Sequence, residues 1–384
     1  MNMVKELEGK MNSLNIAENI VRLRKNKKLT QEQLADFIGV TKASVSKWEN
    51  SQSTPDITIL PQLAAFFNVT IDELVGYEPQ LSKEQIRKLY QDFAKEFAQK
   101  PFDEVMQKTK SYVKRYYSCY AFLFQVCVLW LNHYTLAENN EKKADVLKMI
   151  SELCDHIKSD CSDVKICNDV IIIRAMAELQ RGHGQEVIDS IEDLEDPLRF
   201  SRQGQTILIQ AYLMTGNQSE ADSFTQLSMY NSVFELISEA ACYLTVKADD
   251  AEKCMETIKR IENVIETYCL IELNPNSVAG FEYQAAICSI LNGNFDKAAE
   301  CMEKYAACIL KLFKPDGMKL HGDSYFDNIM KYFEMLDSGT QAPRDRKVVL
   351  EDVKKTMENP VFEPIKDNEK FKNSKKSIEH LEDI

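Results

Sequence analysis

The stretch from Leu29 to Asn50, LTQEQLADFIGVTKASVSKWEN, constrains the fold of this chain more than any other. It contains two short amphipathic runs separated by only a few residues. Two helices joined by so short a turn must cross steeply. The crossing needs a small residue where the backbones approach, a turn residue that tolerates positive φ, and a branched apolar residue to fill the angle. Ala35, Gly39 and Val45 stand at these places, so the spacing predicts a helix-turn-helix, with an unrelated helical hairpin as the alternative.

Both helices of the pair also carry start signals. Thr30 and Gln33 form a capping box for the first helix, and Thr41 can cap the second. Val45 and Trp48 share the inward face of the second helix, so we assign them to the core rather than to a binding surface.

Three further helices are expected around this pair, which gives five between residues 15 and 76. One lies upstream, and two lie downstream. The second downstream helix begins with another capping box, whereas the first contains a proline, which is tolerated if it falls in the first turn. The marker residues are Ile16, Ile20 and Leu23 upstream; Thr58 as cap, Pro61, Leu63 and Ala64 in the first downstream helix; and Thr70, Ile71, Glu73 and Leu74 in the second.

The run LRKNKKLTQEQLADFIGVTKASVSKWEN, followed by Pro55 and LPQLAAFFNVTIDELVG, resembles the DNA-binding domain of the phage-repressor and Cro superfamily, often called the XRE family. The resemblance covers about residues 15–76 and implies a five-helix lambda-repressor-like domain that binds double-stranded DNA. The sequence departs from the family at Ser51, where these domains often carry glycine, so a different loop conformation before Pro55 is expected.

In a helix-turn-helix the second helix enters the major groove and presents its N-terminal residues to base edges. Lysines there can donate to guanine, and an alanine can contact a thymine methyl. For each residue, a solvated helix face is the alternative. The predicted base-reading residues are Lys42, Ala43, Ser46 and Lys47, and the resemblance assigns backbone contacts or bracing to Gln31, Ser44 and Asn50.

The distribution of charge favours binding of a polyanion at the N-terminal end of the chain only. The net charge of the whole sequence is −13, yet residues 14–50 hold seven basic and four acidic residues. A locally basic surface on an acidic protein is typical of nucleic-acid binding.

With only 12 Gly and 10 Pro in 384 residues, the whole chain is predicted to be all-α. Ser82 and Gln85 mark a new capped helix after the linker, and helical patterns continue from there. The expected organisation is an N-terminal extension (1–13), the helix-turn-helix domain (14–76), a linker (77–81) and a helical-repeat domain for sensing and dimerisation (82–384).

Three segments of the last region align on Gly182, Gly216 and Gly293: AMAELQRGHGQEVI, QAYLMTGNQSEADS and ICSILNGNFDKAAE. The first two glycines are 34 residues apart, the tetratricopeptide period, and 34 more reaches Asp250. The next interval is longer, which predicts extra residues around 272–277. Small residues should let each helix pair approach, and Phe295 should fill the gap between repeats. The region resembles a degenerate tetratricopeptide array, and its last segment, NPVFEPIKDNEKFKN, resembles the helices that close such arrays. The alternative is a helical bundle without repeats.

No enzyme is expected, because the sequence contains none of the common nucleotide-binding or hydrolase motifs. The 11 cysteines include no CxxC pair and lie mostly in apolar patterns, which indicates free buried thiols. Cys154, His156, Cys161 and Cys167 fit no zinc pattern, so no metal or cofactor is expected. The absence of a signal sequence or long apolar run predicts a cytoplasmic protein without a membrane partner.

This architecture resembles the peptide-responsive quorum-sensing regulators of Gram-positive bacteria. The resemblance implies a sequence-specific transcriptional regulator that is a homodimer and binds a short peptide on the concave face of its repeats. Counting back from the turn glycines along the first helix of each repeat gives four candidate effector-binding residues: Gln203, Thr206, Gln210 and Tyr283. The alternative is that these residues are ordinary solvated positions on exposed helix faces. Two other functions stay open: a DNA-anchored adaptor that docks a protein partner, and a regulator that uses its repeats only for dimerisation.

Overall fold

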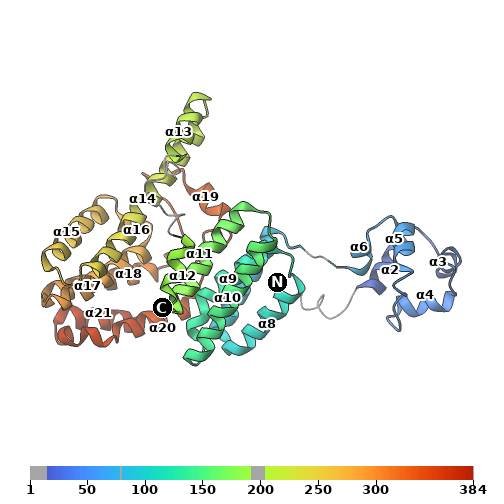
Figure 1. Cartoon of the computed structure of the whole chain (residues 1–384), viewed down its shortest axis with the longest axis horizontal. Coiled ribbons are helices and arrows are strands. Elements are labelled where there is room, and N and C mark those ends of the chain that lie inside the picture. Colours follow the sequence, from blue (N-terminus) through green and yellow to red (C-terminus); the bar gives the residue numbers. More distant parts are fainter. Residues whose placement is uncertain (1–14, 78–79, 192–203, 384) are drawn as a thin grey trace. The chain divides into compact units, whose positions relative to one another are not determined.

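The structure is a computed structural model that describes residues 15–77, 80–191 and 204–383 (Figure 1). Every regular element in these ranges is a helix, which confirms the all-α prediction. The chain divides into two compact units, Met1–Glu186 and Val187–Ile384. Across the described ranges, no helix combines the length and apolar character needed to cross a membrane. The expected N-terminal extension lies outside the described residues.

The predicted five-helix domain is confirmed, and it has a hydrophobic core of its own. Each helix contributes at least one fully buried side chain, such as Ile20, Leu34, Val45, Leu63 and Leu74. The helices are α2 (Ile16–Asn26), α3 (Gln31–Ile38), α4 (Lys42–Glu49), α5 (Leu60–Phe67) and α6 (Ile71–Val75).

The α3–α4 crossing follows the spacing that the sequence predicts. Ala35 and Val45 are both buried in the crossing. Gly39 ends α3 with φ 79°, and its N–H donates to the Ala35 carbonyl at 2.9 Å. Because this left-handed conformation strains any residue with a Cβ, glycine allows the chain to reverse into α4. Thr30 with Gln33 forms the predicted capping box, and Thr41 caps α4 through the Ser44 N–H.

The predicted cap of α5 is wrong. The helix begins at Leu60, its N-cap is Ile59, and no side chain caps it. Both the N–H and the hydroxyl of Thr58 donate to Asp56 Oδ1, at 2.9 and 2.6 Å. An aspartate that binds the residue two positions later forms a local turn, and this turn competes with the cap for Thr58. Pro61 does lie in the first turn of α5.

A second core lies in the rest of the first unit. Helix α9 is apolar around most of its circumference, and α7, α10 and α11 pack against it. The buried Trp130 indole N–H donates to Thr109 of α8 at 2.9 Å, so even the polar atom of this large side chain is satisfied. The elements are α7 (Lys83–Gln99), α8 (Phe102–Arg115), α9 (Tyr120–His133), η1 (Tyr134–Leu136), α10 (Asn140–Asp160) and α11 (Val164–Gln180), and α12 (Gly184–Ile191) crosses the boundary between the units.

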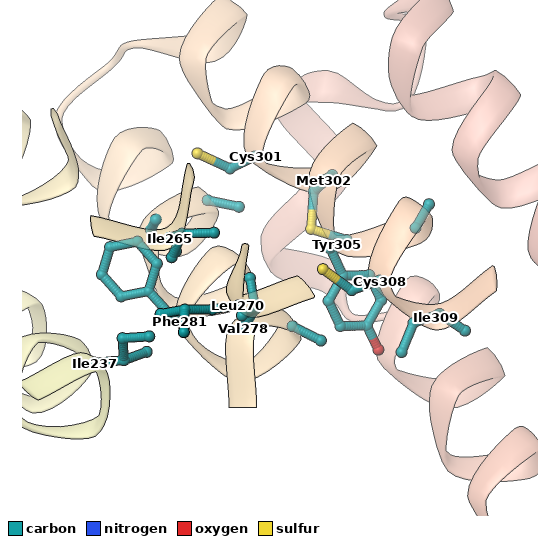
Figure 2. Close-up of a cluster of buried hydrophobic side chains, with 14 of the residues drawn as sticks. Ile237, Ile265, Leu270, Val278, Phe281, Cys301, Met302, Tyr305, Cys308 and Ile309 are labelled. Carbon is teal, nitrogen blue, oxygen red and sulfur yellow. The ribbon is translucent and has the colours of Figure 1, made fainter. Parts of the chain in front are cut away.

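The second unit forms a third core, centred on α15, α17 and α18 (Figure 2). Its central side chains include Ile265, Phe281 and Met302. Helix α18 packs against both α17 and α21. The elements are α13 (Gly204–Met214), α14 (Gln218–Val246), α15 (Ala251–Thr267), α16 (Leu270–Leu273), α17 (Pro275–Leu291), α18 (Phe295–Leu312), α19 (Met330–Met335), α20 (Arg346–Met357), η3 (Pro360–Ile365), α21 (Glu369–Glu379) and η4 (His380–Asp383).

Two of the three helix pairs predicted around the turn glycines pack against each other, α13 with α14 and α17 with α18. Gly182, Gly216 and Gly293 all have positive φ and follow α11, α13 and α17. The extra residues expected near 272–277 include the end of the short helix α16 and the start of α17. Two details differ from a regular array: α14 runs for 29 residues without a turn, and Phe295 is 45% exposed instead of filling the gap between repeats.

The expectation that all cysteines are free thiols is wrong for one pair. Cys254 of α15 and Cys288 of α17 form a disulfide, with Cα atoms 6.9 Å apart. The two residues are 34 positions apart in sequence, and only the packing of α15 on α17 brings them together. The other nine cysteines are free.

Ser51 adopts φ 57°, the left-handed conformation that favours glycine. We therefore expect Ser51→Gly to stabilise the helix-turn-helix domain, by roughly 0.5–1 kcal/mol, because relief of the strain exceeds the entropy that glycine loses on folding. Native-state hydrogen exchange on peptides from α3 to α5 of the full chain measures this locally. Ser53→Gly serves as the control, since Ser53 does not have positive φ and should gain nothing. Faster exchange in the Ser51→Gly variant would contradict the prediction.

Candidate nucleic-acid interface and effector pocket

The four predicted base-reading residues occupy one side of α4. Lys42, Ala43 and Lys47 are exposed, and Ser46 is half-buried. Their spacing of one, four and five positions keeps them on a single helical face, while Val45 and Trp48 face the core. The structure therefore presents these residues together at an accessible surface of a helix-turn-helix.

The three predicted bracing residues each bond to α4 or its cap. The Ser44 hydroxyl lies 2.9 Å from the Thr41 hydroxyl at the start of the helix. At the other end, the Asn50 amide donates to the Ser46 carbonyl at 2.9 Å. Gln31, the first residue of α3, donates to Glu49 Oε2 at 2.9 Å. The Gln31 bond links α3 to α4, and the other two bonds lie within α4 and its caps.

A buried ion pair joins Arg24 of α2 to Glu49 at the end of α4. Arg24 donates through Nε to Glu49 Oε1 at 2.6 Å and through Nη2 to Oε2 at 2.8 Å. Its Nη1 donates to the Leu29 carbonyl at 2.6 Å. The two side chains are only 12% and 5% exposed. The forked geometry ties α2, the α2–α3 loop and α4 into one body.

The surrounding contacts keep both groups of the pair charged. The hydrogen bond from Arg24 to Glu49 is the main reason that the pKa of the guanidinium is raised. Burial alone would raise the pKa of Glu49, but the hydrogen bonds from Arg24 and Gln31 outweigh it and lower that pKa below its usual value. The pair therefore remains ionised at neutral pH.

Sequence reasoning counted Arg24 only among the basic residues of segment 14–50 and overlooked its partner. A signal was available, because Arg24 follows the buried Ile20 by four positions and Glu49 follows the buried Val45 by four. Opposite charges at core-facing positions of two neighbouring helices indicate a buried pair. Lys42, in contrast, forms only a loose, exposed pair with Glu32 at 3.5 Å.

Comparisons with known proteins agree with this geometry. A family profile described as Helix-turn-helix matches residues 20–74. The HTH-type transcriptional regulator YobD of Bacillus subtilis, itself uncharacterised, is 34% identical over 84 residues, which are 22% of this chain and 71% of YobD. The chain belongs to the HTH-type transcriptional regulators. It is therefore a DNA-binding transcriptional regulator.

Two further similarities are more limited. The HTH-type transcriptional activator BcrR of Enterococcus faecalis is 37% identical over 79 residues, which are 19% of this chain. The match spans only 39% of the length of BcrR. The crystal structure of Bacillus thuringiensis PlcR with the peptide PapR7 and DNA aligns with 78% of this chain and 99% of that chain, at 15% identity and a TM-score of 0.26. A TM-score this low does not establish a common fold.

The structure places the predicted effector residues at separate locations. Thr206 and Gln210 are exposed on α13, one turn apart. Tyr283 packs against Phe362, with ring centroids 5.7 Å apart, and its hydroxyl accepts a hydrogen bond from Asn359 at 2.8 Å. Gln203 lies outside the described residues.

A pocket of about 690 Å³ lies between α14 and α17. Its wall on α17 includes Gly280 and Gln284, and its wall on α14 includes Asn231 and Glu235. Sequence reasoning missed these residues. Gln284 directly follows the predicted Tyr283, so a repeat register shifted by one position would have identified it.

Removing the negative charge of Glu49 should destabilise the helix-turn-helix domain. Glu49→Gln leaves Arg24 charged and poorly paired, and we expect a loss of roughly 3 kcal/mol in local unfolding free energy. Because the folded pKa of Glu49 is lowered, its contribution is complete above the unfolded pKa of about 4.3 and disappears as pH falls through the folded value. Hydrogen exchange of α2–α4 at pH 7 and in acid measures both effects.

Glu32→Gln is the matched control, since it removes a carboxylate from a pair whose side chains are more than half exposed. The loss there should be much smaller. Equal protection factors for the Glu49→Gln and Glu32→Gln variants at pH 7 would contradict a stabilising role for the buried pair.

Proposed function

We propose that this regulator binds a palindromic operator as a homodimer and that a short peptide bound in the pocket between α14 and α17 controls it. The observation that supports the DNA reading most directly is the face of α4. Two exposed lysines, an exposed alanine and a half-buried serine share that face, and a buried ion pair holds the end of the helix. Such a face can donate to guanine and contact thymine methyl groups.

An exposed apolar helix supports the proposed homodimer. In α13, none of the side chains from Gln205 to Met214 is buried. Met214 is 88% exposed, and Ile207 and Leu213 are also exposed. Exposed apolar patches of this kind mark interaction surfaces. A second copy of the chain is the partner we assign, because helix-turn-helix proteins commonly read two half-sites as symmetric dimers.

The chemistry of the pocket supports a peptide ligand. Asn231, Asn276 and Gln284 supply amides, each with a donor and an acceptor. An extended peptide offers matching N–H and C=O groups whatever its side chains are. Gly280 also lines the pocket, and a Cβ at this position would meet no atom within 4 Å. A ligand can therefore approach the backbone of α17 closely.

The reading residues can be distinguished from the bracing residues by selection on random DNA. Lys47→Ala should cost roughly 1–3 kcal/mol on the preferred site and relax one base position in each half-site. Gln31→Ala should weaken all sequences more evenly, because it loosens α4 through Glu49. The wild-type motif should be a palindrome with half-sites about one helical turn, or a multiple of it, apart. An unchanged motif in the Lys47→Ala variant would refute the placement, and a motif without two-fold symmetry would refute the dimer.

Substitutions of Gly280 test the pocket, because a small residue at this position serves as the control for a large one. Gly280→Ala should stabilise α17 by about 1 kcal/mol, because glycine is unfavourable inside a helix, and should leave ligand binding intact. Gly280→Trp should fill the pocket and exclude the ligand. Native mass spectrometry of protein purified from its own cells measures peptide retention, which we expect for wild type and Gly280→Ala but not for Gly280→Trp.

The same experiment separates the alternatives. A co-purifying protein in place of a peptide would favour the DNA-anchored adaptor. The absence of both would favour a regulator that uses its repeats only for dimerisation. If a peptide is found, its addition should change operator affinity, and the operator should change peptide affinity by the same factor.

A further inference from the structure

Three potential metal ligands converge in the second unit, on helices that also form its core. Glu262 comes from α15, Glu282 from α17 and Cys301 from α18. One donor atom from each, two carboxylate oxygens and one thiol sulfur, lie within 4.8 Å of one another. Glu282 and Cys301 are buried, and Glu262 is partly buried. Three neighbouring helices thus direct donor atoms to one point.

Glu282 carries an unsatisfied atom at this point. Glu282 is only 2% exposed, and its Oε2 atom is buried without a hydrogen-bond partner. Leaving a buried carboxylate oxygen without a partner costs roughly 1–3 kcal/mol or more. Buried polar groups in folded proteins are nearly always satisfied, so this oxygen calls for a proton, a water molecule or an ion as its partner.

A pocket gives access to the cluster. It has a volume of about 470 Å³, and its lining includes both Glu262 and Glu282. Cys269 and Glu266 line the same pocket. An ion can therefore reach the two carboxylates from outside, and a water molecule has space beside them.

We propose that Glu262, Glu282 and Cys301 bind a divalent metal ion of the zinc class. A thiolate ligand selects zinc or a similarly soft ion over magnesium or calcium, which prefer oxygen ligands only. Three protein ligands leave the fourth tetrahedral position for water from the pocket. The ion replaces the proton of the Cys301 thiol, which passes to the buffer, and no oxidation or reduction takes place.

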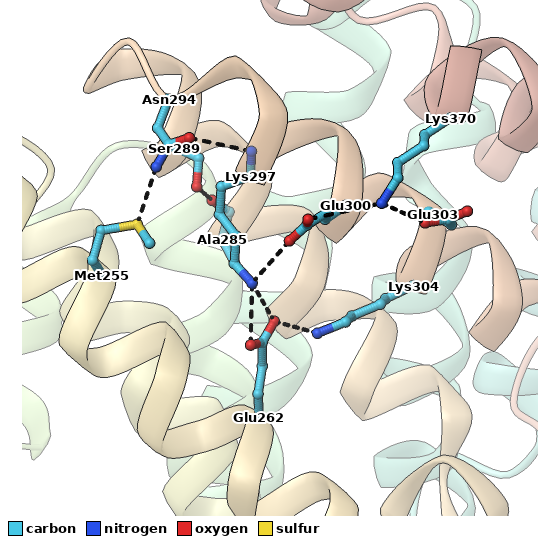
Figure 3. Close-up of polar contacts among 10 residues, drawn as sticks. All are labelled: Met255, Glu262, Ala285, Ser289, Asn294, Lys297, Glu300, Glu303, Lys304 and Lys370. Carbon is cyan, nitrogen blue, oxygen red and sulfur yellow. Dashed lines mark hydrogen bonds and ion pairs between the residues drawn. The ribbon is translucent and has the colours of Figure 1, made fainter. Parts of the chain in front are cut away.

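Two lysines compete with the ion for Glu262 (Figure 3). Lys297 Nζ donates to both carboxylate oxygens, at 2.9 and 3.1 Å, and Lys304 also pairs with Glu262. Their positive charge opposes a cation at this place. The Lys304 side chain is 42% exposed, so its ammonium can turn into solvent when an ion arrives. Lys297 is only 16% exposed, but its Nζ also lies 3.5 Å from Glu300 Oε2, which can hold the ammonium when an ion takes its place on Glu262. The two lysines therefore lower the affinity of the site without blocking it.

Cobalt is the probe for the test, because Co²⁺ bound to thiolate produces a charge-transfer absorption that oxygen and nitrogen ligands do not. The full-length protein is stripped with a chelator and titrated with Co²⁺. We expect one equivalent with a thiolate band, which Zn²⁺ then displaces. Cys301→Ser should remove the band. Cys308→Ser, a change at another buried cysteine of α18, should retain it. Circular dichroism checks that each variant is folded.

Two carboxylate variants and one lysine variant make the test specific to this cluster. Loss of outer-shell groups alone weakens metal sites by roughly 10–100-fold, so Glu282→Gln should weaken Zn²⁺ binding by at least roughly tenfold. Glu303→Gln, on the same helix as Cys301 but paired with Lys370, should have no effect. Lys304→Met should tighten binding. The proposal is overturned if wild type shows no thiolate band, if the band survives in Cys301→Ser, or if folded Glu282→Gln binds Zn²⁺ as tightly as wild type.

Discussion

The buried pair of Arg24 and Glu49 positions the helix that carries the proposed DNA-reading surface. Helix α4 has only eight residues, too few to be stable alone. Its inward face supplies Val45 and Trp48 to the core, and its last residue is held by a forked ion pair to α2. With the inner side fixed in this way, the outward side chains need not contribute to folding. They can therefore be substituted without loss of the buried contacts that hold α4 in place.

The features of this domain that could be predicted are those that depend on residues close together in the sequence. Thr30 and Thr70 bond to residues three positions away, so four consecutive letters are enough to identify each capping box. Thr58 shows where this reasoning stops, because Asp56 competes for it from only two residues away. Arg24 and Glu49 lie 25 residues apart. Only the hydrophobic spacing of both helices, considered together, could have indicated their contact.

In the repeat region, the positions of the helix turns could be predicted from the sequence, but the direction in which each helix faces could not. Its hairpins depend on turn glycines and on buried alanines such as Ala286 and Ala298, both of which can be recognised in sequence. The direction in which each helix faces depends on how neighbouring hairpins stack. This stacking differs from a regular array because α14 continues where a repeat would turn and α16 is inserted before α17. A shift of one residue, from Tyr283 to Gln284, is then enough to exchange a core position for a pocket wall.

Helix α17 connects the two proposed ligand sites of the second unit. Each residue advances about 100° around a helix, so Glu282 points to nearly the opposite side from both Gly280 and Gln284. One side of α17 therefore forms a wall of the pocket shared with α14, and the other faces α15 and α18 with an unsatisfied carboxylate oxygen. An ion that draws Glu282 toward Glu262 and Cys301 acts on the helix that shapes the pocket. Because the two sites share α17, any coupling between them would run through this helix and would be reciprocal.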